Sequence, residues 1–330
     1  MDSSFETPGT TPYALRNNQL GPKRLEPIGE LLLTNEGVEF GRHLFFDVNL
    51  SSNKKVSCAT CHVPELAFSD HVALGRDGVS GNTLARHSPA LVNLMWQDAF
   101  FWDGGAKNLE AQVLGPLTHV DEMDAELTDI IEYLAASDEY IKLHHAAFPD
   151  QDIKIKHVMQ AIAQFEKTLI SSNSWYDQSL NGTFSLSQEE LKGQVLFNIN
   201  CSGCHSAPLF QDQSYHNNGL DADFDYGFED ERLGRNRITN DPADLGKYKT
   251  PSLRNIEVTA PYMHDGRFAT LEDVLNHYSE ELTASTSIDK SLPITTNGFQ
   301  FSDEEKSDII AFLKTLTDPS FLTNPNHRMN

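Results

Sequence analysis

Two short motifs contain every cysteine of this 330-residue chain, and both read Cys-x-x-Cys-His. Two thiols at this spacing can each form a thioether with one haem vinyl group, and the next residue can bind the iron as proximal histidine. Paired cysteines also occur in redox dithiols and in four-thiolate zinc sites. Neither of these explains a histidine after each pair, so the motifs predict two covalently bound c-type haems. The predicted haem-binding residues are Cys58, Cys61, His62, Cys201, Cys204 and His205.

The length and the charge of the chain limit which classes of protein it can belong to. A chain of 330 residues is long enough for two domains, and 39% of its residues are hydrophobic. Lys and Arg number 25 against 48 Asp and Glu, a net charge of −23, which argues against nucleic acid as a partner. Such a surface would attract a basic partner, or it would simply keep the protein soluble. The chain has no run of about 18 apolar residues, so we predict that it does not span a membrane.

The start of the chain, residues 1–11, is polar and lacks the apolar core of a signal peptide. Haem is attached to Cys-x-x-Cys-His outside the cytoplasm. We therefore expect an exported, periplasmic protein whose signal has been removed.

The elements that must position the two motifs are helices. Apolar residues recur at helical spacing, as at Val158, Ile162 and Phe165, and Ser187 with Glu190 forms a capping-box pattern. No segment alternates like a strand, so we predict a mainly α protein. Loops are expected over 63–87 and 206–249, and a polar linker over 171–183. Helices are expected over 27–33, 35–46, 109–113, 126–136, 153–170, 187–197, 271–278 and 303–316.

The chain contains a repeat. GRHLF at 41–45 matches GQVLF at 193–197, and SPALVN at 88–93 matches TPSLRN at 250–255. Asp103 and Asp265 are 162 residues apart, whereas Cys61 and Cys204 are 143 apart, so the second copy carries 19 extra residues after its haem motif. An internal duplication of two cytochrome c-like domains follows. We predict an arm over 1–25, a domain over 26–172 with the first haem, and a domain over 173–330 with the second.

The same offset of 162 pairs Pro116 with Tyr278. Proline has no side-chain donor atom, whereas a tyrosine oxygen can bind haem iron. The first haem is therefore predicted to be open and the second to be closed by Tyr278. Met263 is the alternative ligand of the second haem.

From Gly41 to Leu316 these motifs resemble those of the bacterial di-haem cytochrome c peroxidase and MauG superfamily. The resemblance implies that Trp102 lies between the haems, that Gln112 is the distal-pocket glutamine, and that Glu122 is the acid–base residue. His264 matches a histidine near the second haem. Tyr278 stands where the peroxidases have methionine and MauG has tyrosine, which favours the MauG-like branch. The residues that carry the resemblance are LFFD at 44–47, FWDG at 101–104, LEAQ at 109–112, DEM at 121–123 and TAPYMH at 259–264.

Each of these roles has a simpler alternative: Trp102 could be core, Glu122 one surface acid among many, and Gln112 a solvated side chain.

Three positions depart from the family pattern. A calcium ion would be bound by the carbonyls of Thr259 and Pro261 and an Asn side chain, but the Asn position holds His87. His71 lies in the loop where classical peroxidases carry a removable haem ligand, at a different spacing. Ile199 replaces the tryptophan that MauG has before its second haem motif.

The resemblance implies an enzyme that reacts with hydrogen peroxide at the first haem. Glu122 would move a proton between the peroxide oxygens, and Trp102 would pass oxidising equivalents to the second haem. A MauG-like enzyme would then oxidise Trp or Tyr side chains of a protein partner. A classical peroxidase would instead take electrons from a small redox protein, and a third alternative is a di-haem cytochrome that only transfers electrons.

Overall fold

The computed structural model describes residues 11–14, 33–75, 77–224 and 231–329. Within these ranges the fold is mainly helical, and the only paired strands are β1 (Tyr215–His216) and β2 (Tyr248–Lys249), which run antiparallel. The predicted helix over 27–33 and most of the predicted arm lie outside the described residues, except Leu33. No helix in the described ranges combines the length and apolarity needed to cross a membrane.

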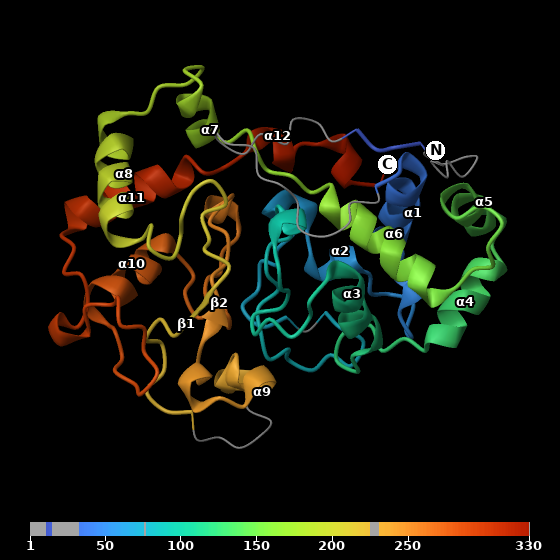
Figure 1. Ribbon diagram of the computed structural model, residues 1–330, viewed down its shortest axis with the longest axis horizontal. Coiled ribbons are helices and arrows are strands. Elements are labelled where there is room, and N and C mark those ends of the chain that lie inside the picture. The colour runs from blue at the N-terminus through green and yellow to red at the C-terminus, as the bar shows by residue number, and fades with distance from the viewer. Residues whose placement is uncertain (1–10, 15–32, 76, 225–230, 330) are drawn as a thin grey trace, which may run out of the picture.

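In the first half, drawn blue to green in Figure 1, helices α1 and α6 cross at a glycine. A Cβ atom on Gly41 would stand 1.8 Å from the carbonyl oxygen of Ala161, so only glycine permits this approach. Phe40, Phe45 and Phe165 fill the core beside the crossing. The helices of this half are α1 (Asn35–Phe46), α2 (Cys58–Cys61), α3 (Leu109–Thr118), α4 (Leu127–Ala135), α5 (Asp138–Ala147) and α6 (Ile155–Lys167).

The second half, drawn yellow-green to red in Figure 1, repeats this arrangement around a second core. Helices α8 and α11 cross at Gly193, where a Cβ atom would stand 1.8 Å from the carbonyl oxygen of Asp308. The helices of this half are α7 (Trp175–Leu180), α8 (Gln188–Asn200), α9 (Asn236–Thr239), α10 (Leu271–Glu280), α11 (Asp303–Lys314) and α12 (Pro319–Leu322).

The offset of 162 residues reappears in the backbone. Helices α3 and α10 begin and end 162 residues apart. Asn93 and Asn255, also 162 apart, both have left-handed backbone, with φ of 56° and 62°. The isolated bridges Phe100–Ala106 and Tyr262–Phe268 follow the same offset. The segments that follow the two Cys-x-x-Cys-His motifs therefore have the same local conformation in both halves.

Hydrogen bonds between the halves are also related by this offset. The backbone N–H of His87 donates to the carbonyl of His264 at 2.8 Å, and that of Lys249 donates to the carbonyl of Trp102 at 2.7 Å. The two donor residues are 162 positions apart, and so are the two acceptor residues. The halves therefore meet through a reciprocal contact that involves Trp102 and His264.

Several predicted elements are confirmed and others are corrected. Helix α1 spans the predicted 35–46, and Ser187 caps α8 in a capping box with Glu190. The prediction of a linker over 171–183 is wrong, because Ser174 and Asp177 cap helix α7 within it. Helix α5 was not predicted, since its sequence DEYIKLHHAA has few apolar residues.

The end of the chain returns to the first half. Phe321 of α12 belongs to the first core and lies 6.1 Å from the ring of Phe68, between ring centroids. The last helix therefore packs on the first half, although it lies after the predicted domain boundary at 172/173 in the sequence. That boundary stays a prediction.

Candidate active site

A cavity of about 920 Å³ extends across both halves and is lined by His62 of the first haem motif and by His205 of the second. A smaller cavity of about 40 Å³ lies beside Cys58, Cys61 and His62. The predicted site residues outside the motifs also line the large cavity: Trp102, Gln112, Pro116, Glu122, Thr259, Pro261, His264 and Tyr278. The fold therefore brings together residues that are up to 216 positions apart in the sequence.

The two motif histidines are oriented alike. Nδ1 of His62 lies 2.8 Å from the carbonyl oxygen of Phe68, and Nδ1 of His205 lies 3.1 Å from that of Phe210. A carbonyl only accepts, so Nδ1 carries the proton and Nε2 is left as the ligand atom. Burial lowers the pKa of both imidazoles, which favours the neutral form that binds iron.

The cysteines do not fit the two alternative chemistries. Burial raises the pKa of Cys58, and it raises the pKa values of Cys61 and Cys201 to about 12, whereas reactive dithiols have a lowered pKa. The four cysteines do not gather into a metal site within the described part of the chain. The histidine orientation and the size of the cavity fit one haem per motif.

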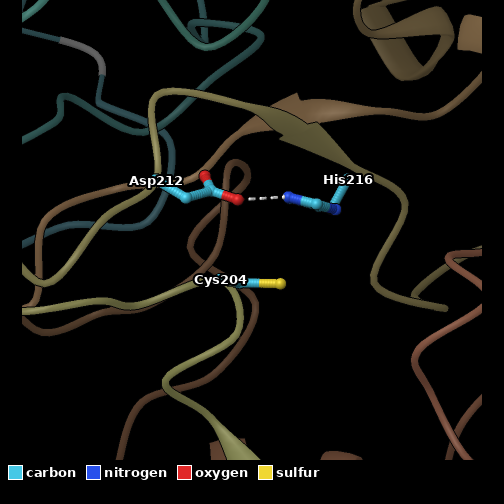
Figure 2. A group of neighbouring side chains, drawn as sticks. All are labelled: Cys204, Asp212 and His216. Atoms are coloured by element: carbon cyan, nitrogen blue, oxygen red, sulfur yellow. Dashed lines mark hydrogen bonds and ion pairs between the residues drawn. The ribbon is translucent and has the colours of Figure 1, made fainter.

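Beside the second motif lies a small charged cluster (Figure 2). His216 stands between two carboxylates, with Nε2 at 2.8 Å from Asp212 and Nδ1 at 2.5 Å from Asp289. Hydrogen bonds with the Cys204 sulfur, Asp289 and Asp212 raise the pKa of His216 against the effect of burial. The contribution of the sulfur would be lost when Cys204 forms its predicted thioether, whereas both carboxylates would remain. His216 connects the loop after the second motif to residue 289. Nothing in the sequence pattern indicated it.

On the cavity side of the first half, Gln112 and Pro116 lie one turn apart on α3 and so share a face. Glu122 follows α3, and its backbone is held by His119 and Val79 at 3.0 and 2.7 Å. Its side chain is 36% exposed, and burial raises its pKa. The site thus contains an amide and a partly buried acid, but no donor atom at position 116.

On the equivalent face of the second half, Tyr278 and Met263 meet. The amide nitrogen Nδ2 of Asn218 lies 3.3 Å from Tyr278 Oη and 3.3 Å from Met263 Sδ. Burial raises the pKa of Tyr278 to about 12. Both candidate ligands of the second iron therefore lie at one place, and the choice between them stays a prediction.

Trp102 lies at the contact between the halves. Its Nε1 donates to the carbonyl of His87 at 2.8 Å, and its neighbour Asp103 forms an ion pair with Arg86 at 2.9 Å. His264, at the equivalent position of the second half, stacks on Tyr248 with ring centroids 3.7 Å apart. Burial lowers the pKa of His264 to about 3, so this ring is neutral.

The donors expected for calcium do not fit. The ring nitrogens of His87 lie 3.2 Å from Ser69 Oγ and 3.0 Å from the carbonyl of Val72, and the ring offers no oxygen. Calcium takes oxygen ligands, so the carbonyls of Thr259 and Pro261 lack the side-chain donor that would complete the site.

His71, the other loop histidine, is 68% exposed and lies beside Asp70. It is not among the residues that line the cavity, so in this conformation it is no ligand of the first iron.

Comparison with known proteins identifies the family. The model of the di-haem cytochrome c peroxidase family matches residues 35–185. The methylamine utilization protein MauG of Methylorubrum extorquens is 38% identical over 300 residues, which cover 89% of this chain and 82% of that protein. The chain belongs to the di-haem cytochrome c peroxidase and MauG family. It is therefore a peroxidase-type oxidoreductase, and the family implies c-type haem as cofactor and hydrogen peroxide as substrate.

Two further relatives show both branches of this family. Cytochrome c551 peroxidase of Nitrosomonas europaea is 34% identical over 299 residues, covering 89% of this chain and 84% of that protein. A crystal structure of a MauG-like protein associated with microbial copper homeostasis superposes with a TM-score of 0.85 at 33% identity, covering 93% of this chain and 97% of that one.

Proposed function

We propose that this protein reacts with hydrogen peroxide at an open haem in the first half and uses a Tyr278-ligated haem in the second half to hold oxidising equivalents. The equivalents then oxidise Trp or Tyr side chains of a protein partner. The observation that carries the proposal is the pair Pro116 and Tyr278, which occupy equivalent places on α3 and α10. The recurring offset of 162 supports two duplicated cytochrome c-like domains, each with one covalent haem.

When bound, the haem of the first half supplies the redox iron at which peroxide reacts. Glu122 would accept a proton from one peroxide oxygen and return it to the other, so that water can leave. Burial raises the pKa of Glu122, so this acid is easier to protonate than an exposed glutamate. Gln112 would donate an amide hydrogen bond that orients the peroxide. Trp102 lies at the contact between the halves, where it can pass charge from one to the other.

Met263 favours a second candidate function. Its sulfur lies as close to Asn218 as the Tyr278 oxygen does, and a thioether ligand would favour the ferrous state and a higher potential. A Met263-ligated haem would suit a classical peroxidase that accepts electrons from a small redox protein. The net charge of −23 would suit a basic partner in either case. A protein that only transfers electrons would need both irons closed, and Pro116 offers no ligand.

The histidine orientation and the half-buried cysteines support haem attachment, and attachment to this motif takes place outside the cytoplasm. We therefore propose that the haem-loaded protein is periplasmic.

The test is stoichiometric peroxide addition to the fully oxidised, haem-loaded protein, followed by optical and Mössbauer spectra. We expect direct reaction to a long-lived state that stores two oxidising equivalents. A protein that is inert until it has been reduced by one electron would be a classical peroxidase instead.

A further inference from the structure

A buried acid lies near the first haem motif and has no role in the mechanism above. Glu166 of α6 is 4% exposed, and its Oε2 has no hydrogen-bond partner in the described part of the chain. It lines the smaller cavity together with Cys58, His62, Gln112 and Glu122. Burying a carboxyl oxygen without a partner costs free energy, so its presence points to a group that it serves.

The second half shows that packing does not require this acid. The helix crossings at Gly41 and Gly193 match Ala161 of α6 with Asp308 of α11. The same alignment matches Phe165 with Phe312 and Glu166 with Leu313. Leu313 is buried and lines the large cavity in the second half. An acid therefore stands at this position only in the half where the haem is predicted to be open.

The charged groups around Glu166 leave it neutral. Lys167 forms an ion pair with Glu110 at 2.9 Å, and none of the described ion pairs includes Glu166. Burial and the charge of Glu110 raise the pKa of Glu166 to about 8, while Lys167 lowers it less. The other titratable groups of the cavity are Cys58, Cys61, Glu122 and His62. Burial lowers the pKa of His62, so none of these groups adds a positive charge beside Glu166. Glu166 therefore carries a proton at neutral pH and faces a cavity that it shares with Glu122.

Peroxide reduction needs such a proton. One hydrogen peroxide with two electrons and two protons gives two waters. The exchange by Glu122 moves a proton from one oxygen to the other and adds no further proton. The electrons come from the protein partner, which is thereby oxidised, or from a redox donor. The two protons must reach the half-buried place between His62 and Glu122.

We propose that Glu166 delivers one of these two protons to the site in the first half and is then protonated again from solvent. This inference rests on the proposed function, since it needs peroxide to react there. Glu166 acts as a proton relay beside Glu122. The second half, where no peroxide is reduced and no proton is needed, has Leu313 at the equivalent position.

The test compares Glu166→Gln and Glu166→Leu with wild type and with Glu132→Gln, which removes an exposed carboxyl of α4. Stopped-flow spectra in H₂O and D₂O follow two steps: the reaction with peroxide, and the return to the resting state when reductant is added. We expect both Glu166 variants to slow the return step by about 10- to 100-fold with a changed pH profile, and to leave the first step unchanged.

Infrared difference spectra give a readout that does not depend on turnover. The carbonyl stretch of a protonated carboxylic acid, which shifts in D₂O, should be present in the haem-loaded wild type and in Glu132→Gln and be lost in both Glu166 variants. Unchanged return kinetics, or failure of Glu166→Gln to retain its haem, would overturn the proposal. A wild type that is inert to peroxide would instead refute the proposed function, while the infrared band would still report the proton.

Discussion

Helices α3 and α10 occupy the same place in the two halves but present different chemistry to the cavity. At the first of two equivalent positions α3 has Gln112 and α10 has Val274; at the second they have Pro116 and Tyr278. The first face has a polar amide and no ligand, and the second has an apolar side chain and a phenol. One fold thus provides a site that can react and a site that can hold charge, by substitution at two positions of one helix.

The cores of the halves differ as well. Arg254 of the second half is fully buried and makes a bidentate ion pair with Asp177 of α7, with nitrogen–oxygen distances of 2.8 and 2.9 Å. The equivalent residue of the first half is Val92, which is also buried. The second half therefore depends on a charged contact where the first uses an apolar one.

The largest effect is expected at Glu122, since only the first half should carry out acid–base chemistry. Glu122→Gln keeps the size of the side chain and removes the proton exchange, so peroxide turnover should fall by about 10²–10⁴-fold while both haems remain bound. Steady-state turnover and the optical spectrum measure the two quantities. Unchanged turnover would contradict the prediction that Glu122 carries out acid–base chemistry in the first half.

The second prediction concerns the ligand of the second haem. Tyr278→Met exchanges a hard oxygen for a soft sulfur, which favours reduced iron, so the long-lived oxidised state should be lost and activity should require prior reduction. Peroxide titration of the oxidised and the half-reduced variant measures this. Met263→Leu is the matched control and should behave as wild type; if it loses the state and Tyr278→Met keeps it, Met263 is the ligand.

The third prediction concerns stability. Asp177→Asn leaves the buried Arg254 without its counter-charge and should lower the free energy of unfolding by about 3–5 kcal/mol, measured by urea denaturation. Burial alone would raise the pKa of Asp177, but hydrogen bonds and the charge of Arg254 hold it below its usual 3.8. The stabilisation is therefore complete above the unfolded pKa and is lost as the pH falls through the folded pKa.

Glu304→Gln, which removes the exposed ion pair with Lys192 at 3.1 Å, is the control and should leave the free energy of unfolding nearly unchanged. Equal losses in the two variants would show that the buried pair adds nothing to the second half.

The smallest effect is expected at Gln112. Gln112→Val gives α3 the residue that α10 carries at this position, and it would remove the proposed hydrogen bond to peroxide. Turnover should fall about 5- to 10-fold, as expected for the loss of about 1 kcal/mol. A larger fall than in Glu122→Gln would reverse the roles of the two residues.

The sequence by itself determined what depends on short spacing. The two Cys-x-x-Cys-His motifs, the helix over 35–46 and the capping box at Ser187 each involve residues within a few turns of one another. The offset of 162 then matched positions of the first half with positions of the second half. It paired Pro116 with Tyr278, and α3 and α10 have that register.

Only the tertiary structure decided which distant groups meet. Asp289 reaches His216 across 73 residues, and Asn218 reaches Tyr278 across 60. In the sequence, Glu166 is an ordinary helix residue beside Lys167. It becomes a candidate proton relay because the helix crossing turns it toward the first haem motif, where its Oε2 has no hydrogen-bond partner among the described residues. Such contacts follow from the packing of whole helices and loops, and no local pattern of residue types encodes them.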